Sequence, residues 1–217
     1  MKSVILSTLA LGALAGAATA DVSYMASVPQ ASTNFSEVVS LPQWDPALFP
    51  NEVLIGVVIT LTANVDGRIR AESNDGEPAT INADLAALVT ANAPAGLQVV
   101  SLPLANFMFA ATAFDGSIDF GGTSGFDTGT LAGADMDSNS LTFPPGNSVP
   151  YIGNGNIAVT VTADGASIVS GAGNIVTVIT TEARATLEIT YQTRIIPAPG
   201  AAAMLGLGGL LIARRRR

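Results

Sequence analysis

Apolar and polar residues alternate along the middle of the chain. Between residues 53 and 65 an apolar residue occupies every second position, and the residues between them are mostly small or polar. The segments 157–162 and 185–192 repeat this alternation. A period of two is typical of a strand that buries one face and exposes the other. Asp164 and Gly165, which follow the second segment, form a candidate hairpin turn.

Shorter stretches of the same kind fill much of the remaining chain, and clusters of Gly, Pro, Asn and Asp separate them. These further strands are predicted near residues 34–41, 67–73, 79–91, 97–102, 105–113, 139–143 and 174–181. The segment 81–89 also has a helical interpretation, but its β-branched ends favour a strand. About ten strands without a long helix predict an all-β fold, an antiparallel β-sandwich of jelly-roll type.

The composition limits the chemistry that this fold can carry. The chain of 217 residues is long enough for one core, so we expect a single domain. It contains no histidine and no cysteine, which excludes a Ser-His-Asp triad, thiol chemistry and thiolate metal sites. Between residues 21 and 196, four arginines stand against 17 acidic residues, a net charge of −13. This negative charge disfavours nucleic acid as a partner, and it also suits a soluble domain outside the cell.

The first 20 residues have the layout of a secretory signal peptide. Lys2 supplies a positive charge, an apolar stretch begins at Val4, and the small residues Ala18 and Ala20 precede Asp21. An apolar helix followed by this A-x-A pattern is a substrate of signal peptidase. We therefore expect an exported protein whose mature chain begins at Asp21.

Residues 195–217 combine a proline pair, an apolar run and a basic cluster. The prolines are Pro197 and Pro199, and the basic cluster is Arg214, Arg215, Arg216 and Arg217. The 13 uncharged residues from 201 to 213 predict a hydrophobic helix of about 20 Å, short of the roughly 30 Å hydrocarbon core of a bilayer. The arginines favour a cytoplasmic position for this end, with the body of the protein outside.

The proline pair, the short Gly-, Leu- and Ala-rich run and the terminal arginines resemble the PEP-CTERM sorting signal of Gram-negative bacteria. The resemblance covers residues 196–217 and implies recognition by exosortase, a membrane-embedded processing enzyme. Ala198 stands where the family usually has glutamate, so either an ordinary exosortase or a variant handles this tail. A permanent anchor is the alternative, and Gly206 and Gly209 also suit close packing of helices.

The body of the chain, residues 21–194, resembles the choice-of-anchor E domain, whose members join one extracellular β-domain to differing C-terminal anchors. The similar stretches are residues 32–48, 113–125, 137–140, 153–163 and 183–193. The resemblance implies a surface-exposed domain of unassigned activity, and it supplies no functional residue.

Few side chains remain for catalysis. Ser124 lies in "GGTSG", but Phe126 stands where a nucleophile elbow needs its second glycine, so Ser124 is expected in a turn. Asp115 and Asp119 are a candidate carboxylate pair for glycoside hydrolysis, which requires a cleft between them. Their spacing across a glycine favours a tight turn instead. We expect no enzymatic activity and no cofactor.

One polar stretch is a weak candidate for a metal site. Asp135, Asp137 and Asn139 alternate like the first three ligands of a calcium loop. Ser140 and Gly146 occupy the places of the glycine and the glutamate that complete such a loop. The alternative is an Asx-rich turn whose side chains bond to their own backbone.

Together these patterns predict a non-enzymatic protein at the surface, or in the exopolysaccharide matrix, of a Gram-negative bacterium. We expect it to be exported and first held in the inner membrane by its C-terminal helix. Its predicted partners are signal peptidase, an exosortase-like enzyme, the membrane and an exopolysaccharide, but not nucleic acid. The alternative is an extracellular module that binds carbohydrate or calcium.

Overall fold

The computed structural model describes residues 21–143 and 149–196. This part of the chain contains β-strands and two short 3-10 helices, η1 (Pro94–Gly96) and η2 (Val149–Tyr151), and no α-helix. The all-β prediction is therefore confirmed for the described residues. The helices predicted within residues 1–20 and 201–213 lie outside them. Within residues 21–143 and 149–196, no helix has the length and hydropathy that a membrane span requires.

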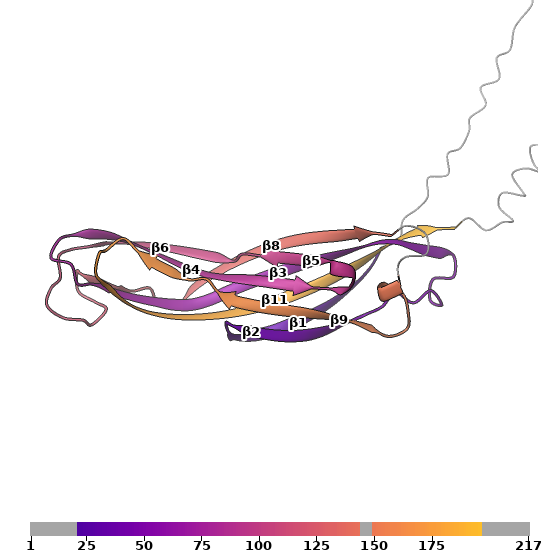
Figure 1. Ribbon diagram of the computed structural model, residues 1–217, viewed down its shortest axis with the longest axis horizontal. Coiled ribbons are helices and arrows are strands. Elements are labelled where there is room, and N and C mark those ends of the chain that lie inside the picture. The colour runs from indigo at the N-terminus through magenta and orange to yellow at the C-terminus, as the bar shows by residue number, and fades with distance from the viewer. Residues whose placement is uncertain (1–20, 144–148, 197–217) are drawn as a thin grey trace, which may run out of the picture.

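The strands form two antiparallel sheets that pack face to face as a sandwich (Figure 1). In sheet 1 the order is β1–β11–β3, and both β7 and β8 pair with β3. Its strands are β1 (Asp21–Ser32), β3 (Glu52–Ser73), β7 (Gly125–Asp127), β8 (Leu131–Thr142) and β11 (Ile175–Ile195).

Sheet 2 is built around β4. The strands β5 and β6 pair with β4 in one continuous register, and β9 and β10 pair with it in another. β9 also pairs with β2, which ends the sheet. The strands are β2 (Phe35–Pro42), β4 (Ala79–Asn92), β5 (Gln98–Ser101), β6 (Leu104–Ala111), β9 (Asn156–Gly165) and β10 (Ile168–Ser170).

The longest pairing joins β3 to β11. The predicted strands 53–65 and 67–73 are one strand in the structure, as are 174–181 and 185–192. The register shifts once, between Gln192 and Thr193, and Ile55 is the extra residue opposite this step. Because of this bulge Leu54 is buried and Val53 is exposed, so the predicted alternation fails at the start of β3.

Alternate residues of both sheets fill the space between them. Each such side chain contributes about 1.5–3 kcal/mol to folding when it is fully buried. The largest fully buried aliphatic residues on the paired inner faces are Leu41, Ile59, Leu61, Ile69, Ile81, Leu85, Leu187 and Ile189. These residues come from β2, β3, β4 and β11, and they hold the two sheets together.

Two other predictions differ from the structure. Asp164 and Gly165 do not form a hairpin turn, because both belong to β9 and pair with β4. The strand predicted at 139–143 is the end of β8, which begins at Leu131. β8 carries polar residues on both faces, so its sequence does not alternate between apolar and polar positions. An edge strand buries little of its surface, which permits such a sequence. The strands β1, β7 and β10 were not predicted.

The ends of the described chain lie together. Asp21 pairs with Gln192, so β1 begins beside the end of β11, at what we call the terminal pole. β3 ends at Ser73 at the opposite end, the distal pole, on the left of Figure 1. Backbone hydrogen bonds from Phe114 to Asp75 and from Ser73 to Ser124 place the loop 112–124 at this distal pole.

Gly67 on β3 lies where β11 of the same sheet and Leu85 of sheet 2 both approach closely. A Cβ added to Gly67 would overlap the carbonyl oxygen of Thr180 and lie 2.9 Å from Leu85 Cδ1 of sheet 2. Gly67→Ala is therefore expected to destabilise the protein by about 1–3 kcal/mol through overpacking. Urea unfolding of the purified chain, followed by circular dichroism, measures the change.

Gly76→Ala is the matched control, because an added Cβ there meets nothing within 4 Å. Equal stability of the Gly67 variant and the wild type would show that β11 and Leu85 do not approach Gly67 as closely as in this structure.

Candidate functional site

Asp135, Asp137 and Asn139 lie on strand β8, at the rim of sheet 1. Their partners on β3 are core residues with buried side chains, so the three polar side chains share the face that looks toward sheet 2. The prediction of an Asx-rich turn is therefore wrong, because this stretch is extended and paired. An extended strand also does not wrap its side chains around one ion as a calcium loop does.

Two of these residues connect β8 to β5 and the residue after it. The Asp135 carboxylate accepts hydrogen bonds from Leu102 N–H at 2.7 Å and from the Ser101 hydroxyl at 3.0 Å. Asn139 Nδ2 donates to the carbonyl oxygen of Gln98 at 2.9 Å. These contacts close one long side of the sandwich with polar bonds between its sheets.

The donors around Asp135 also change its acidity. The hydrogen bonds from Leu102 and Ser101 stabilise the charged form and lower the pKa of Asp135 below the usual value of 3.8. Asp137 accepts from its neighbour Ser138 N–H at 2.8 Å. No group of three or more acidic side chains in the described residues is arranged to hold one metal ion. The calcium assignment for this row stays a prediction.

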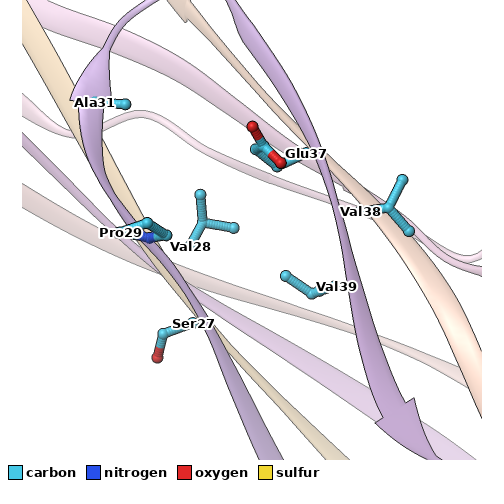
Figure 2. Close-up of a pocket in the computed structure, with 7 residues that line it drawn as sticks. All are labelled: Ser27, Val28, Pro29, Ala31, Glu37, Val38 and Val39. Carbon is cyan, nitrogen blue, oxygen red and sulfur yellow. The ribbon is translucent and has the colours of Figure 1, made fainter.

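On the other long side an open groove lies between the edge strands β1 and β2 (Figure 2). Its volume is about 300 Å³. The lining residues are Ser27, Val28, Pro29, Ala31, Glu37, Val38 and Val39. Glu37 is the charged residue among them, so the groove offers one carboxylate and no aromatic surface. It has neither the paired acids of a glycosidase nor a platform for a sugar ring.

The same groove marks two sheet edges that lack a partner strand among the described residues. The register of β1 shifts between Val28 and Ala31, and Pro29 within this shift has no N–H to donate. Glu37 pairs with Val161 of β9, whose side chain is in the core, so the Glu37 carboxylate lies on the inward side of β2. A bulge, a proline and an inward charge all oppose the addition of another strand.

Most of the large polar aromatic residues are buried. Trp44, Tyr151 and Tyr191 are at most 2% exposed. Tyr151 donates its hydroxyl to the carbonyl oxygen of Pro94 at 2.6 Å, and burial raises the pKa of Tyr151 to about 12. These side chains hold the terminal pole together and do not form a surface on which a sugar ring could stack.

The loop 112–124 contains the other candidates. Asp115 and Asp119 accept hydrogen bonds from the N–H groups of Ser117 and Gly121, each two residues further on. Both carboxylates therefore stabilise tight turns, in agreement with the expectation from their spacing. Ser124 is fully buried, and its hydroxyl donates to Glu72 at 2.6 Å.

Glu72 itself was not among the predicted site residues. It lies on β3 next to Ala71, whose side chain is in the core, so a period-two pattern assigns Glu72 to the exposed face. The residues predicted for signal cleavage, Ala18 and Ala20, lie outside the described residues. The sorting residues Pro197, Pro199 and Arg214 to Arg217 lie outside them too.

No family model and no curated protein matches this chain. The VP2 subviral particle of infectious bursal disease virus is 13% identical over 91% of this chain and 49% of that chain, with a TM-score of 0.22. The T13 particle of that virus is 13% identical over 91% and 45%, with a TM-score of 0.23. The chain thus spans about half the length of these proteins. At such TM-scores the likeness supports no argument about function.

The Asp135 contacts generate a prediction about stability. Asp135→Ala removes the acceptor of the buried Ser101 hydroxyl and of Leu102 N–H, which is expected to cost about 1 kcal/mol near pH 7. Because the pKa of Asp135 is lower in the folded state, this contribution is present above the usual pKa of an aspartate. It is lost as the pH falls through the folded value. Urea unfolding at several pH values measures the effect.

Asp137→Ala is the control, because the bond that its carboxylate accepts comes from the adjacent Ser138 N–H and does not cross to sheet 2. An Asp135 variant that loses no more stability than the Asp137 variant would contradict the role assigned to the β8–β5 contact.

Proposed function

We propose that this chain is an exported, non-enzymatic β-sandwich, delivered through its C-terminal tail to the surface or extracellular matrix of a Gram-negative cell. The position of the two ends of the domain carries the proposal. β11 ends at Ile195, just before the proline pair, and Asp21, the first residue of the expected mature chain, is already paired with Gln192 of β11. Removal of the segment that contains the prolines therefore leaves β11 intact.

The geometry also suits attachment at one end. Both ends of the described chain lie at the terminal pole, because Asp21 pairs with Gln192. The 21 residues of β11 span about 70 Å at the rise of an extended strand. A domain held by its tail at the inner membrane would present the distal loops well away from the bilayer. The choice-of-anchor E assignment and the jelly-roll connectivity belong to the same proposal.

The chemistry of the domain supports a structural role over catalysis. The chain has no histidine or cysteine, and the Ser124 hydroxyl is buried against Glu72. Asp115 and Asp119 stabilise their own loop. Signal peptidase, an exosortase-like enzyme and an exopolysaccharide are the partners that this role requires.

A double proline variant tests the sorting function. Changing both Pro197 and Pro199 to Ala is expected to leave the protein exported and membrane-bound but unprocessed. The reason is that the prolines keep the chain before the helix extended and accessible at the outer face of the membrane. Immunoblots of membrane and culture-medium fractions measure the result.

Gly200→Ala, directly after the pair, is the control and should be processed normally. Neutral residues in place of Arg214 to Arg217 should weaken retention and let the tail pass through the membrane. If the double proline variant is processed like the wild type, the tail is not a sorting signal that depends on these prolines.

A further inference from the structure

At the distal pole a carboxylate is buried under a loop. Glu72 is 0% exposed, although it lies on the face of β3 that is turned away from the core. The loop 112–124 covers it there. Phe120 of this loop lies under the guanidinium of Arg70, 5.1 Å from ring centroid to Cζ, and Arg70 shares the outer face of β3 with Glu72.

The local sequence fits this carboxylate closely. Glu72 pairs with Gly125 on β7, and a Cβ added to Gly125 would overlap the Glu72 carboxylate. Glu72 Oε1 accepts the Ser124 hydroxyl at 2.6 Å, and Ser124 Oγ in turn accepts Asp115 N–H at 3.3 Å. One oxygen of the carboxylate is thus bonded into the loop.

The other oxygen lacks a partner. Glu72 Oε2 is buried and has no hydrogen-bond partner among the described residues, and the same is true of Asn74 Oδ1. The bond from Asn74 N–H to the carbonyl oxygen of Asn174, 2.8 Å long, continues the β3–β11 ladder by one residue. The Asn74 side chain, two residues after Glu72, is therefore expected on the same side of the sheet as Glu72. The end of β3 and the residue after it thus carry, two positions apart, two buried acceptor oxygens without a hydrogen-bond partner in the described part of the chain.

Such an arrangement is costly unless a positive group meets it. A buried acceptor oxygen without a partner destabilises the folded state, and buried charges are normally paired or coordinate a cation. Arg70 is the nearest basic residue along β3, and its guanidinium stacks on Phe120. The surrounding loops add negative charge through Asp75, Glu77, Asp115 and Asp119.

We propose that the distal pole binds a hard divalent cation, calcium, through Glu72 Oε2 and Asn74 Oδ1 under the loop 112–124. Both ligands are oxygens, which calcium prefers, and a loop adapts to its irregular coordination more easily than to the octahedral demands of magnesium. Water and loop carbonyls complete the shell. With two side-chain ligands, the expected dissociation constant lies in the range of extracellular modules, about 10⁻⁴–10⁻³ M. This site is distinct from the row on β8.

Thermal unfolding of the purified full-length chain, after removal of metal with a chelator, tests the proposal. Calcium at 100 times its dissociation constant is expected to raise the Tm by about 5–10 °C. Isothermal titration calorimetry should give one calcium ion per chain. In Glu72→Gln the shift should disappear, because the amide removes the charged ligand. The metal-free variant should be at least as stable as the metal-free wild type, since it no longer buries an unpaired charge.

Glu77→Gln is the matched control, because it makes the same chemical change at an exposed residue of the same pole. It should keep the full calcium shift. No shift in the wild type at about 10 mM calcium, ten times the weakest expected dissociation constant, would overturn the proposal. An equal shift in Glu72→Gln would overturn it as well, because the ion would then bind elsewhere.

Discussion

The pairing of β3 with β11 is the interaction on which the rest of the sandwich depends. The two strands run together from the terminal pole to the distal pole with a single bulge, and their inner residues supply much of the core. β1, β7 and β8 attach to this pair, and sheet 2 packs against its buried face. The register of this pair determines which residues of β3 and β11 lie opposite each other. It therefore also determines which residues meet at each pole.

The two poles have different chemistry as a result. The terminal pole gathers both ends of the described chain and several buried aromatic residues, including Trp44 and Tyr191. The distal pole gathers acidic loops around a buried glutamate. In the proposed function the first is the side of attachment to the membrane. The second faces outward, where a cation from the surroundings would reach it.

The alternation of apolar and polar residues predicted the buried face of a strand correctly where the strand is regular. From Val57 to Val65 the alternation gives the correct buried face, because every second residue enters the core. It fails at Ile55, where the extra residue exists only relative to β11. It fails again at β8, whose polar residues bond across the rim to β5. Glu72 was missed because a loop some 50 positions further along the chain buries it, and no neighbouring residue signals that cover.

In the proposed function, the described sandwich lies between two segments that are removed during export and sorting. Intact-mass spectrometry of the native protein from its host's envelope and culture medium tests this account most directly. The account predicts a chain that begins at Asp21 and lacks Arg214 to Arg217. A native chain that retains residues 1–20 and ends at Arg217 would contradict it.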